Sequence, residues 1–168
     1  MKKILFWILS CIIAILIPIY LLFHIYPQKI MRIEGNDYVL CNDLIWGEFS
    51  HKLDKTTYSF EGWVVYPGIQ QGYAVLDNKS VWLYETDTEV FYKLKSQQSS
   101  KRDKTISEKI NDGIDYQSSI FSVSVDLGNL NLSQNVFDIY ICYQHGGNNY
   151  LVKTNMSIDK GILINNEV

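Results

Sequence analysis

The chain has 168 residues, of which 15 are Lys or Arg and 18 are Asp or Glu, so its formal net charge at pH 7 is −3. This balance argues against nucleic acid binding, because phosphate recognition by nucleic-acid-binding proteins relies on clustered basic residues. Aromatic residues make up 14% of the chain, a bias that favours strands over helices.

The N-terminal region predicts a transmembrane helix. Residues 4–26 contain no Asp, Glu, Lys or Arg, and a helix of that length spans about 34 Å, slightly more than the ~30 Å hydrocarbon core of a bilayer. A cleaved signal peptide has a shorter apolar region that ends in small residues. The alternative of a lipidated Cys11 is weaker, because only six apolar residues precede Ser10. We therefore predict an uncleaved anchor over residues 4–26.

The charges that flank this segment predict its orientation. Lys2 and Lys3 precede it and a long C-terminal part follows it, an arrangement that favours a cytoplasmic N-terminus. We expect a single-pass protein of the cell membrane, in which residues 1–3 form the cytoplasmic end and residues 27–168 are extracytoplasmic.

The remainder of the chain reads mainly as strands. Residues 27–57 carry short apolar stretches separated by Gly, Asn and Asp, which predicts a juxtamembrane connector with short strands. Over residues 58–160, five or six runs with period-two alternation predict an antiparallel β-sandwich domain. Residues 103–112 interrupt this pattern and predict one or two helical turns, capped by Asp103 or Thr105. Residues 161–168 are expected to form an edge strand or a tail.

The alternation in the last two strong runs predicts which side chains form the core. In the run at 119–127 and in the run that follows Asn135, large apolar residues recur at every second position, so they share one face of each strand. The residues expected to point inward are Phe121, Val123, Val125, Leu127, Phe137, Ile139, Ile141 and Tyr143.

Several motifs along this domain carry a family resemblance. They are FEGW at 60–63, VWLY at 81–84, Arg102 with Asp103, SIF at 119–121, and Leu127 with Leu130 before VFDIYICY. Over roughly residues 58–159 they resemble the small accessory domain found beside bacterial teichoic-acid and other cell-envelope polysaccharide glycosyl- or glycerophosphotransferases. Ile120 stands where that family usually has Gly. The resemblance implies an immunoglobulin-like fold and an accessory role, in docking or in contact with an envelope polymer.

The expected architecture is therefore mainly β, with an N-terminal transmembrane helix followed by an antiparallel immunoglobulin-like β-sandwich. The sequence carries no motif for catalysis or for cofactor binding. His24, His51 and His145 have no second His or Cys at metal-ligand spacing, and there is no G-x-S-x-G or Gly-rich phosphate loop. We predict no catalytic residues, no metal, no cofactor and no enzymatic activity.

Four aromatic residues are candidates for ligand binding. Trp63, Tyr66, Trp82 and Tyr84, with Trp46 nearby, are of the type that stacks on sugar rings. The competing interpretation is that these side chains fill the core and its interfaces, because a small sandwich needs large side chains. Trp82 and Tyr84 alternate with Val81 and Leu83, so both faces of that strand are apolar, and one face is either covered by another element or available to a partner.

Cys41 and Cys142 are the cysteines of the predicted extracytoplasmic part. A bridge between them would close a loop of about 100 residues, worth up to ~4.7 kcal/mol in the chain-entropy model. Against pairing, Cys142 lies on the face opposite the predicted core of its strand.

These observations lead to one functional hypothesis and two alternatives. The first is a membrane-anchored accessory or interaction protein of bacterial envelope polysaccharide or teichoic-acid biogenesis. Its expected partners are the membrane, an envelope glycosyltransferase or polysaccharide exporter, or the polymer itself. The alternatives are a carbohydrate-binding module and an unrecognised envelope hydrolase, since the spacing of paired carboxylates is a property of the fold.

Overall fold

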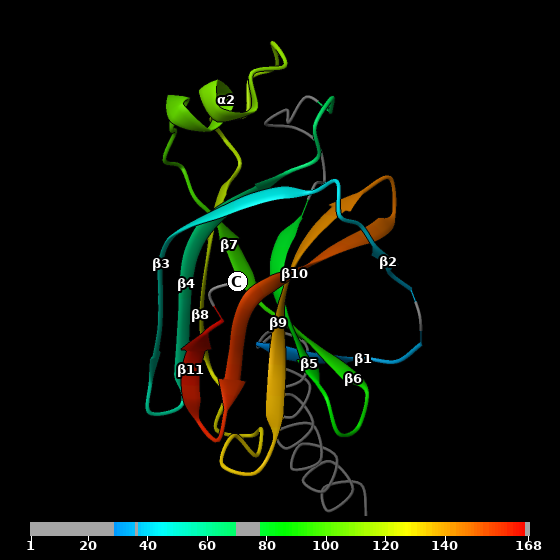
Figure 1. Cartoon of the computed structure of the whole chain (residues 1–168), viewed down its shortest axis with the longest axis vertical. Coiled ribbons are helices and arrows are strands. Elements are labelled where there is room, and N and C mark those ends of the chain that lie inside the picture. Colours follow the sequence, from blue (N-terminus) through cyan, green and yellow to red (C-terminus); the bar gives the residue numbers. More distant parts are fainter. Residues whose placement is uncertain (1–28, 36, 70–77, 167–168) are drawn as a thin grey trace, which may run out of the picture.

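The computed structural model describes residues 29–35, 37–69 and 78–166 of the chain. These residues form two β-sheets and a short helix, α2 (Figure 1). Strand pairing is antiparallel except between β2 and β10, which run parallel. The expectation of a mainly β protein with antiparallel sheets is confirmed.

The smaller sheet has four strands in the order β3-β4-β8-β7. Their bounds are Ile45–Asp54 for β3, Thr57–Val65 for β4, Ser96–Gln98 for β7 and Ile120–Asp126 for β8.

The larger sheet has seven strands. Six follow the order β1-β6-β5-β9-β10-β11, and β2 pairs beside them with β10. The bounds are Ile30–Ile33 for β1, Val39–Leu40 for β2, Lys79–Glu85 for β5, Val90–Leu94 for β6, Val136–His145 for β9, Asn148–Asp159 for β10 and Ile162–Asn165 for β11.

The two sheets pack against each other around one main core, the two-layer arrangement expected of a β-sandwich. Strands β4 and β8 of the small sheet and β5 and β9 of the large sheet supply most of its side chains. The eight residues predicted to point inward are all in this core, and each is at most 3% exposed. The period-two interpretation of β8 and β9 is therefore confirmed.

A second cluster lies on the outer face of the large sheet. Tyr140 and Cys142 of β9 point away from the main core, yet both are buried there with Trp82 and Phe91. Residues that flank the connection between β1 and β2 explain the burial, because Ile33 at the end of β1 and Tyr38 before β2 pack against the cluster. The ring centroid of Tyr38 lies 4.8 Å from that of Phe91 and 6.5 Å from that of Trp82. Another element therefore covers the second apolar face of β5.

Helix α2, Lys104–Ile110, is the predicted helical segment, and of the two candidate caps Asp103 is the N-cap. Its carboxylate accepts a 2.9 Å hydrogen bond from the backbone nitrogen of Thr105. Ile106 is buried beneath the helix in a third cluster, with Trp63 of β4 and Tyr116. The helix thus covers the outer face of the small sheet at one end.

The segment between the predicted anchor and the sandwich domain contributes strands to both sheets. β1 pairs with β6 and β2 pairs with β10 in the large sheet, while the ten-residue β3 pairs with β4 along its length. Residues 162–165 form the edge strand β11. No helix within the described ranges is long and apolar enough to cross a bilayer. The anchor predicted over residues 4–26 lies outside those ranges.

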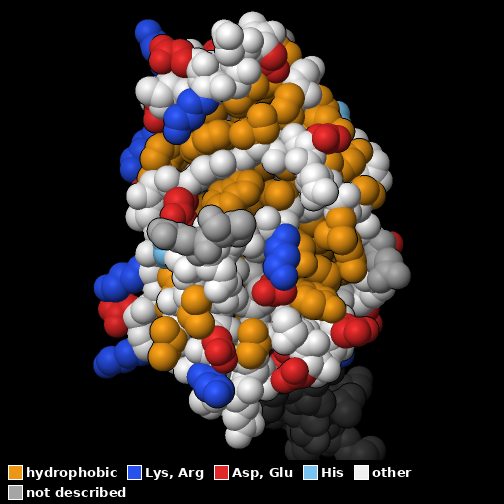
Figure 2. All heavy atoms as spheres, in the orientation of Figure 1, with side chains coloured by type: hydrophobic (Ala, Val, Ile, Leu, Met, Phe, Trp, Pro, Cys, Tyr) orange, Lys and Arg blue, Asp and Glu red, His pale blue; other side chains and the backbone are white. Residues whose placement is uncertain are grey.

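Some large hydrophobic side chains stay on the surface. On the face shown in Figure 2, hydrophobic side chains gather across the upper and middle parts, and basic and acidic side chains are scattered among and around them. The most exposed large hydrophobic residues are Met31, Val39, Leu40, Ile45, Phe49 and Ile162.

Candidate functional site

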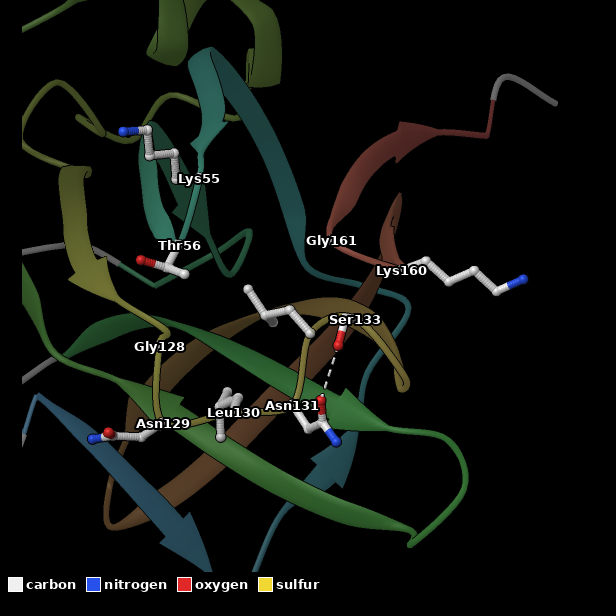
Figure 3. A pocket seen from close by; sticks show the side chains of 10 residues that line it. Lys55, Thr56, Gly128, Asn129, Leu130, Asn131, Ser133, Lys160 and Gly161 are labelled. Carbon is white, nitrogen blue, oxygen red and sulfur yellow. Dashed lines mark hydrogen bonds between the residues drawn. The ribbon is translucent and has the colours of Figure 1, made fainter.

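An open groove lies at the end of the sandwich where three connections meet (Figure 3). The turn between β3 and β4 supplies Lys55 and Thr56, and the turn between β10 and β11 supplies Lys160 and Gly161. Between them runs the loop from β8 to β9, which contributes residues 128–133. This hollow, which we call the turn half, has a volume of about 510 Å³.

A second hollow of about 510 Å³ adjoins the first. Asn129 and Leu130 line both, so the two hollows adjoin the same β8–β9 loop. The remaining walls of this β1 half come from the start of β1, from β6 and from the end of β8: Lys29, Ile30, Arg32, Tyr92 and Asp126. We call the two halves together the end groove.

The β8–β9 loop is held in place by packing against the core and by hydrogen bonds. Leu127 and Leu132 are buried in the main core, and the backbone nitrogen of Leu127 donates a 2.8 Å hydrogen bond to the carbonyl of Thr56. Inside the loop, Asn131 accepts from the hydroxyl of Ser133 at 3.1 Å and donates to Gln134 at 2.6 Å. These contacts give the groove a preformed floor.

The two lysines of the turn half occupy special backbone positions. Lys55 has φ 56° and Lys160 has φ 49°, both in the left-handed region that non-glycine residues rarely adopt. Gly161, with φ 76°, completes a two-residue hairpin turn that needs positive φ at both positions. In Figure 3 the two ammonium groups stand at opposite rims and reach outward, away from each other. The turn half is therefore flanked by positive charge on two sides.

The charges that line the end groove are predominantly positive. The lining includes one carboxylate, that of Asp126, and four cations: Lys29, Arg32, Lys55 and Lys160. Within the part of the chain that the structure describes, none of the four cations forms an ion pair. By contrast, Lys52, Lys101 and Lys153 on the strands and loops elsewhere are each paired with a carboxylate.

The single carboxylate of the groove is already occupied by neighbours. Asp126 accepts a 2.9 Å hydrogen bond from the backbone nitrogen of Gly128. The hydrogen bond with the Thr56 side chain, then that with Gly128, and finally the charge of Lys29 hold the pKa of Asp126 below its ordinary value. Asp126 therefore stays ionised at neutral pH, as the one negative charge among the four positive charges that line the groove.

The groove offers groups for binding and few for catalysis. Among the described residues, Asp126 is the one carboxylate that lines it, and no His or Cys does. The described ranges also contain no group of three or more His, Cys, Asp or Glu residues that could hold a metal ion. What remains are ammonium, guanidinium, amide and hydroxyl groups, which recognise phosphate or sugar oxygens.

The structure separates the four aromatic residues predicted to bind a ligand. Trp63 is 4% exposed beneath α2, with the ammonium of Lys109 5.8 Å from its ring centroid. Trp82 is 1% exposed in the cluster on the outer face of the large sheet, and Tyr84 packs against the same cluster. Tyr66 lies elsewhere. Only Trp82 and Tyr84 are brought together, and the faces of both Trp rings are covered by protein.

Tyr66 does not lie beside the other three candidate residues but packs against Tyr150. Its ring centroid lies 5.5 Å from that of Tyr150, in an edge-to-face arrangement on the rim of the main core. Trp46 also packs partly buried against that core. The nearby thiol of Cys41 is the largest of the influences that raise the pKa of Tyr66.

Cys41 and Cys142 are both buried and both free. Cys41 packs in the main core, whereas Cys142 packs in the outer cluster, and β10 lies between their positions. Two strand spacings of ~4.8 Å separate such positions by about 10 Å, beyond the ~7 Å between Cα atoms that a disulfide tolerates.

The groove residues themselves were not among the candidates that the sequence suggested. Lys55, Asn129, Asn131 and Lys160 occur in clusters of Asn, Gly, Lys and Ser between strands, which sequence analysis reads as ordinary turns. The available signal was a lysine in each of two tight turns, at positions that usually carry Gly or Asn. That these turns meet at one end is a property of strand order.

Comparison with known proteins adds no further constraint. Neither family models nor curated proteins nor solved structures gave a match to this chain.

Proposed function

We propose that the protein is a membrane-anchored, extracytoplasmic accessory protein of bacterial envelope biogenesis, and that it holds a phosphate-bearing envelope polymer in the end groove without catalysing a reaction. The expected class of polymer is a teichoic acid or a similar anionic polysaccharide. An envelope glycosyltransferase or polysaccharide exporter is the proposed protein partner.

The charge of the groove is the observation that carries this proposal. The groove is lined by four cations that form no ion pair among the described residues, Lys29, Arg32, Lys55 and Lys160, although the chain as a whole has a net charge of −3. A local concentration of unpaired cations on an acidic protein favours anions at that place. Charge-assisted hydrogen bonds from Arg and Lys to phosphate are the contacts such a surface makes best.

The order of strands supports the immunoglobulin-like assignment within this proposal. If β3, β4, β5, β6, β7, β8, β9 and β10 are lettered A, B, C, C′, D, E, F and G, the small sheet reads A-B-E-D. The large sheet then contains C′-C-F-G. This is the division of strands found in immunoglobulin-like sandwiches, with β1, β2 and β11 added.

The membrane anchor rests on the sequence. Residues 4–26 contain no Asp, Glu, Lys or Arg, and Lys29 of the groove follows that segment by three residues. At ~3.3 Å per extended residue, the β1 half of the groove begins within about 10 Å of the end of the predicted span. A polymer synthesised or exported at the membrane surface would pass this position.

A carbohydrate-binding module is the second candidate, favoured by the pair of Tyr66 and Tyr150. Their edge-to-face rings are partly exposed at the rim of the core, and aromatic rings with a polar tip are suited to sugar contacts. The hydrolase alternative requires two carboxylates in one cleft, and the described lining of the end groove has one.

Isothermal titration calorimetry on the full chain in detergent micelles tests the proposal. We expect synthetic poly(glycerol phosphate) to bind with an affinity that falls steeply as salt is raised, and a neutral oligosaccharide of equal length to show no binding. The double variant Lys55→Gln, Lys160→Gln should weaken binding. The matched double variant Lys52→Gln, Lys104→Gln removes two exposed charges outside the groove and should not.

Two outcomes of the titration contradict the proposal. Absence of binding to poly(glycerol phosphate) at low salt would exclude a phosphate-bearing polymer as the ligand. Binding of the neutral oligosaccharide that depends on Tyr66 and not on Lys55 favours the carbohydrate-binding module instead. Crosslinking in the native membrane tests the protein partner, and failure to capture any envelope-synthesis protein contradicts that part.

A further inference from the structure

We propose that a hollow between the β1–β6 edge and β8 binds the phosphate-bearing headgroup of an anionic lipid, taken from the bilayer in which the chain is anchored. This inference rests on the membrane anchor of the proposed function. It adds a ligand and a site that the end groove does not account for.

The hollow forms where an edge of the large sheet meets the small sheet. Lys29, just before β1, and Lys95, just after β6, line it from the large sheet, while Gln97 of β7 and residues 122–125 of β8 line it from the small sheet. Its volume is about 180 Å³, equal to about six water molecules at ~30 Å³ each. This is room for one phosphate group and the atoms next to it. We call this space the headgroup hollow.

The backbone holds the two lysines of the headgroup hollow side by side. The backbone nitrogen of Lys95 donates a 2.8 Å hydrogen bond to the carbonyl of Lys29, and the next pair in the ladder is Ile30 with Leu94. Residues opposite each other in an antiparallel pair have Cβ atoms about 4.5–5.5 Å apart. Both lysines are exposed, and neither forms an ion pair within the described ranges. Like charges in opposite positions repel, so an anion bound between them relieves that repulsion.

The remaining polar groups of the headgroup hollow are free to bind a ligand. The lining includes the amide of Gln97 and the hydroxyls of Ser122 and Ser124, and none of these side chains makes a hydrogen bond to another described residue. No carboxylate is among the described residues that line the hollow. Amide and hydroxyl groups bind both phosphate oxygens and the hydroxyls of a glycerol headgroup. The lining therefore combines two positive charges with uncharged hydrogen-bonding groups.

One carboxylate lies close to this lining. Asp126 follows Val125 in β8, and the charge of Lys29 is the smallest of the three influences that lower its pKa, after its hydrogen bonds with Thr56 and Gly128. Asp126 therefore already has hydrogen-bond donors of its own, and it offsets part of the charge of Lys29. Lys95 is the cation that belongs to the headgroup hollow and not to the end groove.

The length of the tether favours a lipid as the source of the phosphate. Lys29 follows the predicted span by three residues, so it lies at most about 10 Å from the end of the span at ~3.3 Å per residue. The headgroup layer of a bilayer is about 5–8 Å thick on each side. Lys29 is therefore within a Debye length of about 8 Å of the headgroups. Met31, two residues further along the chain, is 52% exposed, and an apolar side chain at this place is compatible with contact with lipid.

A lipid titration of the full chain in neutral detergent micelles tests the inference. Phosphatidylglycerol is the anionic probe, phosphatidylcholine is the comparison, and native mass spectrometry counts the bound lipid. A Lys or Arg near an anionic surface contributes about fivefold in affinity. We therefore expect one phosphatidylglycerol to bind at least about fivefold more tightly than phosphatidylcholine, with a preference that shrinks as salt is raised.

Single variants assign this preference to the headgroup hollow. Lys95→Gln should lower the affinity for phosphatidylglycerol by about fivefold and leave the affinity for phosphatidylcholine unchanged. Lys104→Gln removes an exposed charge outside the hollow and should change neither. The double variant Lys55→Gln, Lys160→Gln should also change neither, because those lysines line the turn half of the end groove. Circular dichroism of each variant verifies that the sheets are intact.

Acylation of lysine amines in nanodiscs locates the contact. With phosphatidylglycerol in the bilayer, Lys29 and Lys95 should react more slowly than in nanodiscs of phosphatidylcholine alone. Lys52 and Lys104 should react equally in both. Mass spectrometry of the digested chain measures each rate, and equal rates for Lys95 in the two bilayers would contradict the inference.

The possible failures are distinguishable. If phosphatidylglycerol is not preferred, or if the preference survives Lys95→Gln, the lipid inference is wrong, while polymer binding that depends on Lys55 and Lys160 is unaffected. If soluble glycerol phosphate displaces phosphatidylglycerol at equal concentration, the hollow is a site for free phosphate, which also overturns the inference. If the full chain does not remain in nanodiscs, the membrane anchor is wrong, and both proposals fail.

Discussion

The buried hydroxyl of Tyr116 donates a 2.6 Å hydrogen bond to Oδ2 of Asp112. The backbone nitrogen of Gly68 donates to both side chains, at 2.8 Å to the hydroxyl and 3.1 Å to the carboxylate. These contacts join the turn after β4 to the loop after α2, at the end of the sandwich opposite the end groove. These hydrogen bonds fix the position of α2 over Trp63.

Replacement of Tyr116 by Phe should therefore destabilise the domain. The change removes a hydrogen bond to a carboxylate and leaves Gly68 with one acceptor, so we expect the free energy of unfolding to fall by about 1 kcal/mol. Urea unfolding of the full chain in micelles, followed by tryptophan fluorescence, measures it. The matched control is Tyr58→Phe, because the buried hydroxyl of Tyr58 has no hydrogen-bond partner and its removal should be neutral or stabilising. Equal losses in both variants would contradict this interpretation.

The same cluster predicts a dependence of stability on acid pH. The hydrogen bond from Tyr116 is the largest of the influences that hold the pKa of Asp112 below its ordinary value. The stability that this carboxylate contributes is complete above its unfolded pKa of about 3.9, and it is lost as pH falls through the lower folded value. Asp112→Asn lacks this contribution. Its stability should be lower than that of the wild type near neutral pH and should fall less steeply below about pH 4; parallel curves would be inconsistent with this assignment.

Gly62 should not tolerate a side chain. A Cβ at this position would lie 2.5 Å from the backbone oxygen of Gly47 and 2.5 Å from Cζ of Phe60, so β3 and β4 would have to separate. We expect Gly62→Ala to lower the free energy of unfolding by about 1–3 kcal/mol. At Gly128 the nearest atom is a carboxylate oxygen of Asp126, 3.2 Å away, and Gly128→Ala should stay within about 0.5 kcal/mol of the wild type. A larger effect at Gly128 than at Gly62 would refute this packing argument.

Lys55 should show opposite effects on stability and on binding. Its φ of 56° is costly for a residue with a Cβ, so Lys55→Gly should raise the free energy of unfolding by up to about 1 kcal/mol. It also removes a cation from the end groove and should weaken binding of poly(glycerol phosphate). Glu89, with φ 57° in the β5–β6 turn, is the matched control. The Glu89→Gly variant should gain the same free energy of unfolding and keep its affinity for poly(glycerol phosphate). Denaturation and calorimetry on the same samples separate the two effects.

The thiol of Cys142 should be unreactive in the folded protein. Burial is the main influence that raises its pKa to about 12, and the thiolate is the nucleophilic form. Iodoacetamide at pH 8 should leave Cys142 unmodified until the chain is unfolded, as followed by mass spectrometry of the peptide that contains it. No peptide in which Cys41 is bridged to Cys142 should be recovered without reduction, because β10 lies between the two. Rapid labelling of the native protein, or a bridged peptide, would contradict this prediction.

Local sequence determined the inward faces of β8 and β9 and the position of α2. The inward faces of β8 and β9 follow from alternation within each strand, because successive side chains of a strand point to opposite sides. The helix at 104–110 follows from Asp103 as a cap and from the spacing of Ile106 and Ile110. Both patterns extend over only a few residues and can be recognised in the sequence.

The tertiary structure alone decided what those elements bring together. Trp63 and Trp82 both read as candidates for a binding surface, yet α2 covers one and Tyr38 covers the other. The residues that cover them are distant in sequence, so no local pattern reports the burial. The end groove has the same origin, since the turns at Lys55 and Lys160 meet the β8–β9 loop only because each connects strands at the same end of the sandwich. Alternation along a strand is set by the backbone within a few residues, whereas strand order is set by packing of the whole core.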